Sequence, residues 1–284
     1  MTTQPREFYR PADWPSALSA LDRPDRSAAP LVTAPRVPAE PYAGVNAVVD
    51  LSRLDLAQIK QTNATIALGG LVALQDLVDA PWQRDPALGI LSEAAHLAAH
   101  AGLRRLATVA GVLSARSGPP ELLLALLALD TVVVLRRHGP SERELPLADL
   151  LRLESMPAGE VITAVTFARP SAQAAGALAR VARTPRDEAI VAAAAVLVVE
   201  GGICTRAALS LAGAGVAPRR TAAAEAVLEG QTLSAALLAK AAAAAAAGLT
   251  FASDLRGRAD YRLAMAAVVA RRCLATAWER AHAQ

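Results

Sequence analysis

Two long, strand-like segments separated by a glycine turn constrain the fold of this chain more than any other feature of its sequence. The runs Ala189 to Val199 and Cys204 to Leu211 flank the tripeptide Glu200-Gly201-Gly202. Segments of this length that are rich in apolar residues and joined by a short glycine-containing connection are typical of a β-hairpin. The pattern predicts a pair of antiparallel strands in the second half of the chain.

Three helical segments are expected between this hairpin and the C-terminus. The first runs from Thr221 to Leu228 and stops at Gly230, because glycine commonly ends helices. The second is capped by Ser234 and stops at Gly248, and the third begins near Asp260 with apolar residues at helical spacing. A small antiparallel sheet accompanied by helices is therefore expected in this half.

Strand-like and helical segments also alternate in the first half of the chain. Extended or strand segments are expected at Phe8–Pro11, Leu31-Val32, Ala47–Leu51, Ala64–Leu68, Thr131–Leu135 and Glu160–Phe167. Helices are expected from the cap Asp13 to Leu21, from Leu88 to Arg104 and from Glu121 to Leu129. The small residues Ser171 to Gly176 are interpreted as a linker. This pattern indicates an α+β protein of two domains, at residues 1–172 (two subdomains, divided near residue 60) and 177–280.

The composition excludes several classes of protein. Hydrophobic residues make up 54% of the 284 residues, but many are alanines, so the mean hydropathy of +0.31 does not indicate a membrane protein. No stretch approaches the ~20 bulky apolar residues of a transmembrane segment, and no signal peptide is visible. The two cysteines are far apart, so a reduced, cytoplasmic chain is expected. Scattered arginines and only 3% aromatic residues argue against nucleic-acid binding, despite a net charge of +3.

One helical segment carries a possible metal-binding pattern. Glu93, His96 and His100 are spaced so that they could share one helix face and ligate a metal ion. No further ligands lie nearby in the sequence, so an ordinary polar helix face is the favoured interpretation, with no metal. The GxSxG and GxxxxGK[ST] motifs are absent, so hydrolase and P-loop functions lack their main signals. No side chain is assigned a catalytic role.

The segment Leu103 to Leu113 is the most informative part of the chain. Its small residues would let backbone N–H groups approach a phosphate, as in anion-binding nests. From these residues alone, an ordinary connection between a helix and a loop explains the segment better.

The same segment resembles the Arg-Asn-x-x-Thr-Ile-Gly-Gly-Asn motif of the flavin-binding (medium) subunits of molybdenum hydroxylases, the group of aerobic carbon monoxide dehydrogenase and xanthine dehydrogenase. Arg104, Thr108 and Gly111 match the motif, and Ala110 replaces its first glycine. Further similarities follow in order along nearly the whole chain, at Phe8–Pro11, Val49–Leu51, Ile66–Gly70, Arg180 to Val191, Pro218–Arg220, Leu228–Gly230 and Tyr261-Arg262. The resemblance implies an N-terminal FAD-binding α/β domain of the PCMH-like type and a C-terminal domain with a small antiparallel sheet and helices.

The sequence departs from this family where the cofactor should bind. Family members carry Ala-Gly-Gly-Thr-x-Leu after the first helix, and the corresponding residues here are Val32, Thr33, Ala34, Pro35, Arg36 and Val37. Both glycines are missing, and proline has no N–H to donate. The added Cβ atoms crowd a backbone that must approach phosphate closely. Arg36 could compensate by pairing with a phosphate.

The resemblance implies a cofactor-binding set in the two loops and at the crossing between the domains. Glu121 stands where the family often has Asp, and Arg180 stands where it tends to have Lys. The full set is Val32, Thr33, Ala34, Pro35, Arg36, Val37, Arg104, Thr108, Ala110, Gly111, Glu121, Arg180 and Asp187.

The resemblance also implies a function within a hetero-oligomeric complex. A molybdenum-cofactor large subunit would oxidise the substrate, and a 2Fe-2S small subunit would carry the electrons to FAD in this chain. FAD would then pass them to NAD, a quinone or oxygen. The altered loops suggest an alternative, in which the chain has lost FAD and serves as a structural docking subunit. The sequence leaves both hypotheses open.

Overall fold

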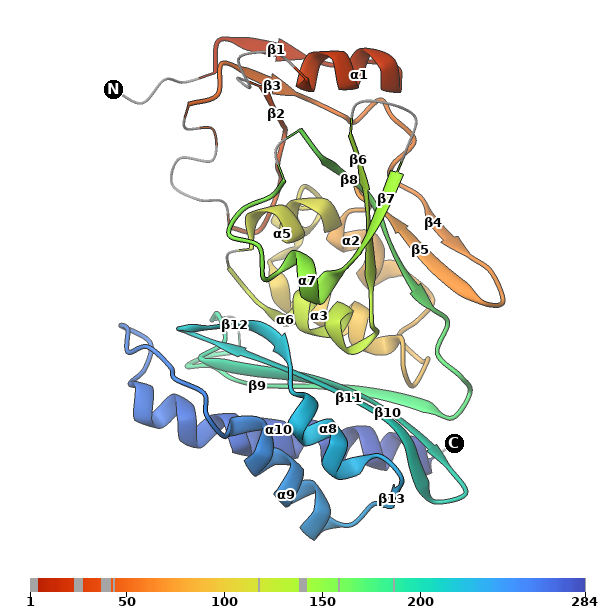
Figure 1. The fold of residues 1–284 in the computed structure, drawn as a ribbon, viewed down its shortest axis with the longest axis vertical. Coiled ribbons are helices and arrows are strands. Elements are labelled where there is room, and N and C mark those ends of the chain that lie inside the picture. The colour runs from red at the N-terminus through yellow and green to blue at the C-terminus, as the bar shows by residue number, and fades with distance from the viewer. Residues whose placement is uncertain are drawn as a thin grey trace.

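A computed structural model of the chain describes residues 5–22, 28–36, 42, 44–116, 118–137, 142–157, 159–185 and 187–283. These residues form three sheets, one with three strands and two with five. Figure 1 shows the N-terminal sheet at one end of the long axis and the C-terminal sheet with its helices at the other. The mixture of sheets and helices confirms the α+β fold class.

The N-terminal sheet is small and parallel. Its strands, in spatial order, are β1 (Glu7–Tyr9), β3 (Ala47–Val49) and β2 (Ala28–Pro30). Helix α1 (Trp14–Leu21) packs against it and begins at the expected cap, because the Asp13 carboxylate accepts a hydrogen bond from Ser16 N at 2.8 Å. This N-terminal sheet and α1 together are called the N-terminal layer below.

The strand expected at Leu31-Val32 is wrong in position, because β2 ends just before it. Leu31 N still donates to Val49 O at 2.8 Å, but Val32 N donates to the Tyr42 hydroxyl at 2.9 Å. Val32 N faces the open side of this edge strand, and the Tyr42 hydroxyl accepts its hydrogen bond there.

The middle sheet is antiparallel. Its strands, in spatial order, are β4 (Ile59–Gln61), β5 (Thr65–Gly69), β8 (Val161–Ala168), β6 (Val132–Arg136) and β7 (Glu142–Pro146). The three expected strands β5, β6 and β8 are confirmed to within one residue at each end. The edge strands β4 and β7 were not expected, because both are mostly polar and exposed and give no apolar signal.

Short helices accompany the middle sheet. They are α2 (Leu74–Asp79), α3 (Gly89–Ala98), α4 (Ala101–Arg104), α5 (Val109–Ala115), α6 (Glu121–Ala128) and α7 (Leu147–Leu150). Of these, α5 and α7 contact its strands, and α3 and α6 pack on the C-terminal sheet. The prediction of one helix from Leu88 to Arg104 is wrong, because Ala99 is extended and separates α3 from α4. The buried Arg104 guanidinium stabilises the break by donating to Ala99 O at 2.8 Å.

Helix α5 was not expected either. The sequence favours an ordinary connection between a helix and a loop in this segment, but Thr108 caps a helix there, with its Oγ1 accepting from Gly111 N at 3.1 Å. The alanine and glycine in this short helix weaken the apolar periodicity by which helices are recognised.

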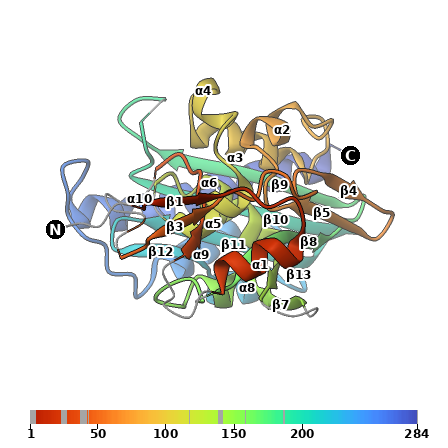
Figure 2. The ribbon, with the colours of Figure 1, turned by 90° about the horizontal axis from the view of Figure 1, so that it is seen from above.

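The C-terminal sheet confirms the hairpin on which the sequence argument began. Its strands are β9 (Ala174–Val181), β10 (Val191–Glu200), β11 (Ile203–Gly213) and β12 (Val216–Arg220), all antiparallel, with β13 (Gln231–Thr232) pairing with β11. The turn joins Glu200 to its partner Ile203. The three expected helices are confirmed as α8 (Ala222–Leu228), α9 (Ala235–Ala246) and α10 (Ala259–His282). Helix α10 runs along this sheet (Figures 1 and 2).

The linker expected at Ser171 to Gly176 is wrong for its last part, because β9 begins at Ala174. These residues are small because they pack closely, not because they are flexible. Gly176 N donates to Pro86 O at 2.8 Å, and a Cβ on Gly176 would lie 2.8 Å from Ala87 O.

Helix α6 joins the two halves of the molecule. All eight of its residues are buried, and it packs on β10 and β11. Polar links fix it to the C-terminal sheet, and they join Glu121 to Arg180, Leu124 O to Ser210 and Leu127 O to Arg220. Just beyond the helix, Asp130 pairs with Arg206 and Arg220. Among the described residues, no helix combines the length and apolar character needed to span a membrane.

Candidate functional site

A cleft of about 320 Å³ lies between the N-terminal layer and the middle sheet. Its walls are largely apolar and include Leu51, Leu56, Leu71, Val161 and Ile162. Four residues of the expected cofactor-binding set also line it, and they are Val32, Thr108, Ala110 and Gly111. The two sequence segments that the family resemblance singled out therefore border one cavity.

The two loops contact each other directly at this cleft. Thr108 N donates to Thr33 O at 2.9 Å, and the hydroxyl oxygens of Thr33 and Thr108 are 3.5 Å apart. A Cβ on Gly111 would lie 1.9 Å from Thr33 O, which no side chain can occupy. Gly111 is therefore required for the contact between the loops.

The backbone N–H groups of the two loops differ in what they can offer a ligand. In the second loop, every N–H from Thr108 to Val112 donates within the protein, at 2.8 to 3.1 Å. In the first loop, the N–H groups of Thr33 and Ala34 have no acceptor among the described residues, and Pro35 has no N–H. Among the described residues, backbone donors available to an anion are therefore found in the first loop and not in the second.

Two arginines of the expected set lie away from the lining of this cleft. Arg104 is buried and donates to Gln75 Oε1 at 3.0 Å and to the carbonyl oxygens that end α3. Arg36 Nη2 lies 2.8 Å from Glu188 Oε2, in the connection between β9 and β10 of the C-terminal sheet. Val37, the last residue of the first loop, lies outside the described residues.

The other three residues of the set form a cluster at the junction of the domains. Glu121 is fully buried, and its Oε1 accepts from Arg180 Nη1 at 2.9 Å. The same Nη1 donates to Asp187 O at 2.9 Å, while the Asp187 carboxylate faces Arg183 at 3.4 Å. Burial raises the pKa of Glu121 above its ordinary value, and this effect exceeds the opposing effect of Arg180. Glu121 Oε2 has no hydrogen-bond partner among the described residues.

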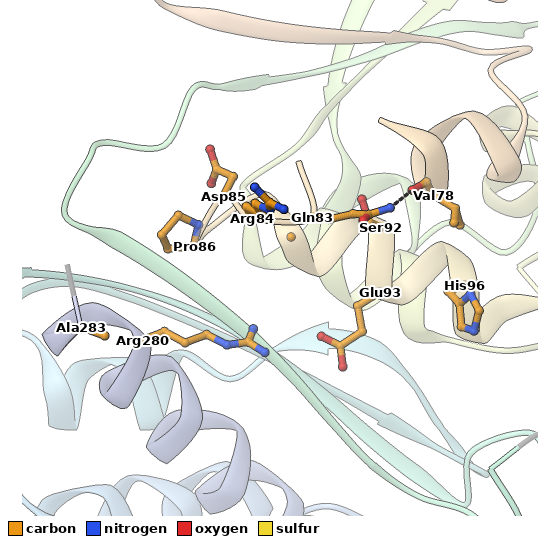
Figure 3. Close-up of a pocket in the computed structure, with 11 residues that line it drawn as sticks. Val78, Gln83, Arg84, Asp85, Pro86, Ser92, Glu93, His96, Arg280 and Ala283 are labelled. Carbon is orange, nitrogen blue, oxygen red and sulfur yellow. Dashed lines mark hydrogen bonds between the residues drawn. The ribbon is translucent and has the colours of Figure 1, made fainter. Parts of the chain in front are cut away.

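A second cavity, of about 550 Å³, lies at another boundary of the two domains (Figure 3). Glu93 and His96 of α3 line it, and Figure 3 shows Glu93 extending toward Arg280 of α10. His100 lies beyond the end of α3, so the shared helix face considered for a metal site does not form. Across the described ranges, no group of three or more His, Cys, Asp or Glu side chains could hold a metal ion.

Sequence reasoning missed two groups that shape the first cleft. Tyr42 fixes Val32 N through its hydroxyl, and no pattern in the sequence pointed to it. Gly70 O accepts from Ala110 N at 2.8 Å, and a Cβ on Gly70 would lie 2.4 Å from Ile162 O. The pair Gly69-Gly70 was the available signal, since adjacent glycines mark places where backbones approach closely.

Comparisons with known proteins agree with this architecture. Residues 4–170 match the family described as FAD binding domain in molybdopterin dehydrogenase, and residues 177–277 match the CO dehydrogenase flavoprotein C-terminal domain. The 6-hydroxypseudooxynicotine dehydrogenase complex subunit alpha of Paenarthrobacter nicotinovorans is 34% identical over 239 residues, which are 82% of this chain and 80% of that protein.

Two relatives from carbon monoxide dehydrogenases match over almost their whole length. The carbon monoxide dehydrogenase medium chain of Afipia carboxidovorans is 28% identical over 283 residues, which are 97% of each chain. The solved structure of reconstituted CO dehydrogenase from Oligotropha carboxidovorans superposes with a TM-score of 0.86 at 27% identity, over 99% of each chain.

The two-domain fold and the cleft between its loops define the class of FAD-binding subunits of oxidoreductases. Within this class, the chain belongs to the flavoprotein (medium) subunits of the molybdenum hydroxylases, of the carbon monoxide dehydrogenase type, a family whose cofactor is FAD. The resemblance stated from the sequence is thereby confirmed.

Proposed function

We propose that this chain binds FAD in the cleft between the N-terminal layer and the middle sheet and relays electrons through it. The electrons would come from 2Fe-2S clusters in a small partner subunit, after a molybdenum-cofactor large subunit has oxidised the substrate. They would leave to NAD, a quinone or oxygen. When bound, FAD supplies the redox step, because flavins exchange both single electrons and electron pairs, while the protein provides binding and orientation.

The observation that carries this proposal is that the N–H groups of Thr33 and Ala34 have no acceptor among the described residues. They lie in a loop whose Val32 lines the cavity, and Gly111 of the second loop lines it too. Backbone N–H groups without protein acceptors are suited to bind the oxygens of a diphosphate. The apolar walls would exclude water from the remainder of the cofactor.

The remaining residues of the expected set have supporting roles in this proposal. Arg104 fixes the α3–α4 break and thereby the start of the second loop. Glu121, Arg180 and Asp187 join the N-terminal domain (residues 1–172) to the C-terminal domain (residues 177–280). We further propose a cytoplasmic location, which the two buried free thiols support.

A docking subunit without FAD is the second candidate, and one observation favours it. The N–H groups of the second loop are all engaged within the protein, and the first loop has Ala34 and Pro35 where the family has glycines. Each lost hydrogen bond to a charged group removes about 1.5–3 kcal/mol of binding free energy. In this alternative, the chain would assemble the complex without carrying electrons.

The experiment that separates the two candidates is cofactor release from the assembled complex. The chain is co-expressed with its molybdenum and iron–sulfur partner subunits and purified, and the acid-released fraction is examined by visible spectroscopy. Stoichiometric FAD in that fraction supports the relay function. A colourless fraction would reject it in favour of the docking role.

A gain of function provides a second test at the first loop. Pro35→Gly adds an N–H group where the diphosphate is expected, so FAD should bind about tenfold more tightly, the effect of one modest additional hydrogen bond. Pro170→Gly, in the connection between the domains, is the matched control and should leave the dissociation constant unchanged. Equal affinities in both variants would place the diphosphate elsewhere.

A further inference from the structure

One carboxylate oxygen receives two arginines that come from opposite ends of the chain. Glu188 Oε2 lies 2.8 Å from Arg36 Nη2 and 2.6 Å from Arg256 Nη2. Arg36 belongs to the first loop, whereas Arg256 belongs to the loop before α10. The Glu188 side chain is largely buried, with 18% of its surface exposed, so solvent screens these pairs less than pairs on the open surface.

Arg36 is the second of two anchors that hold the first loop. At the N-terminal end, Leu31 N, Val32 N and Thr33 O are bonded to Val49, Tyr42 and Thr108. At the other end, the Arg36 guanidinium pairs with Glu188, and its Cβ lies 3.0 Å from the position of a Cβ on Gly118. The Thr33 N–H group lies within the first anchor and the Ala34 N–H group lies between the two anchors, and neither has an acceptor among the described residues. Both anchors therefore determine where these groups point.

The loop that carries Arg256 is itself fixed. Asp254 Oδ1 accepts from Arg256 N at 2.7 Å and from Gly257 N at 3.2 Å. The Asp254 carboxylate also pairs with Arg262, which is only 1% exposed and donates to Ile190 O at 2.6 Å. The C-terminal domain therefore holds one side of Glu188 in place independently of the first loop.

We propose that Glu188 is a positioning residue through which the C-terminal domain sets the conformation of the FAD-binding first loop. The carboxylate holds Arg36, and Arg36 holds the C-terminal end of the loop, so that the Thr33 and Ala34 N–H groups are preorganised for the diphosphate of FAD. This inference rests on the proposed function. It gives the arginine a role different from direct phosphate binding.

The test compares Glu188→Gln, Arg36→Gln and the double variant in the full chain. Asp149→Asn is the matched control, because it removes the same charge from an exposed pair with Arg152 that lies within one helical turn. Two quantities are measured: the dissociation constant of FAD, and the hydrogen exchange rate of the peptide covering residues 28–36 without FAD. The second readout depends on the loop alone.

If Glu188 positions the loop, Glu188→Gln should accelerate exchange in that peptide and weaken FAD binding roughly tenfold. Arg36→Gln should have the same effect, and the double variant should be no worse than either single one, because both changes release the same anchor. Glu188→Asp keeps the charge and should recover part of the affinity. The control should match the unaltered chain in both measurements.

Two results would overturn the positioning role of Glu188, and a third would separate that role from the flavin function. Unchanged exchange and unchanged affinity in Glu188→Gln would overturn the positioning role and leave the flavin function standing. An Arg36→Gln defect much larger than that of Glu188→Gln would assign the arginine to the phosphate itself and also overturn it. Accelerated exchange in Glu188→Gln, in a chain that never binds FAD, would support the anchor and reject the flavin function.

Discussion

The N-terminal layer and helix α6 are held in the molecule in very different ways. The core of the N-terminal layer is a small cluster, made of Ala17, Leu21, Val49, Leu51, Leu54, Leu56 and Val161. Helix α6, in contrast, is buried along its entire length in the largest core of the molecule. Because hydrophobic stabilisation grows with the apolar area removed from water, most of it is concentrated around α6.

The region that contributes most to stability is therefore not the region in which we propose that the cofactor binds. The cleft lies against the lightly packed layer, which can therefore adjust around a ligand at little cost in free energy. Helix α6 fixes the two domains relative to each other. None of its residues lines the cleft. Substitutions in the α6 region should therefore mainly lower the free energy of unfolding, and substitutions at the cleft should mainly weaken FAD binding.

The largest effect is expected for Glu121→Ala at the buried end of α6. The substitution leaves Arg180 buried without its carboxylate partner, and breaking such a pair costs about 3–5 kcal/mol of unfolding free energy. Urea denaturation of the purified chain measures this loss. A loss as small as that of a surface substitution would contradict the conclusion that the α6 region contributes most to stability.

A matched pair of leucine truncations follows in size. Leu124→Ala in α6 should lower the free energy of unfolding by about 4 kcal/mol, and Leu21→Ala in the N-terminal layer by about 2 kcal/mol. These values lie near the upper and lower ends of the usual range, because a tightly packed site loses more than a loosely packed one. The free energies of unfolding come from the same urea titrations. If Leu21→Ala proves as costly as Leu124→Ala, the N-terminal layer is not the weaker region.

Gly111→Ala tests the role of the contact between the two loops at the cleft. The added Cβ would lie 1.9 Å from Thr33 O, so the two loops must move apart. We expect a stability loss of about 1–3 kcal/mol from overpacking, together with a clear loss of FAD from the isolated protein. Gly102→Ala in α4, where a Cβ meets only the His100 ring at 3.4 Å, is the control and should retain both properties.

The smallest effect is a pH dependence at Glu121. Its pKa is raised by burial, so the folded state binds its proton more tightly than the unfolded state does. The stabilisation from this group is complete below the ordinary glutamate pKa and is lost as pH rises through the raised folded value. The unaltered chain should therefore lose stability relative to Glu121→Gln on going from pH 4.5 to pH 7. A parallel pH profile for the two proteins would contradict this sign.

The C-terminal half could be predicted from the sequence, and the middle of the chain only in part. The hairpin around Gly201-Gly202 and the three following helices carry local signals, namely glycine turns, caps such as Ser234 and apolar periodicity. Helix α5 and the break at Ala99 depend on tertiary contacts of Thr108 and Arg104, which no local pattern encodes.

In the candidate site too, some features could be predicted from the sequence and others depend on the folded structure. That the two loops meet was implied by the family resemblance, and Gly111 was identified by its match to the motif. The pairing of Arg36 with Glu188, by contrast, joins residues that are far apart in sequence, and either could have been an ordinary surface charge. Ion pairs of this kind leave no periodic trace, so only the folded arrangement reveals them.

The complete burial of α6 has a consequence for anyone who wishes to recombine these subunits. The helix belongs to the N-terminal half in sequence, but it covers one face of the C-terminal sheet and is joined to that sheet by polar bonds along its length. A chimaera spliced between residues 171 and 176 would give that sheet a foreign helix whose shape and bonding were selected elsewhere. A chimaera of two related chains should therefore take α6 and the C-terminal domain from the same parent.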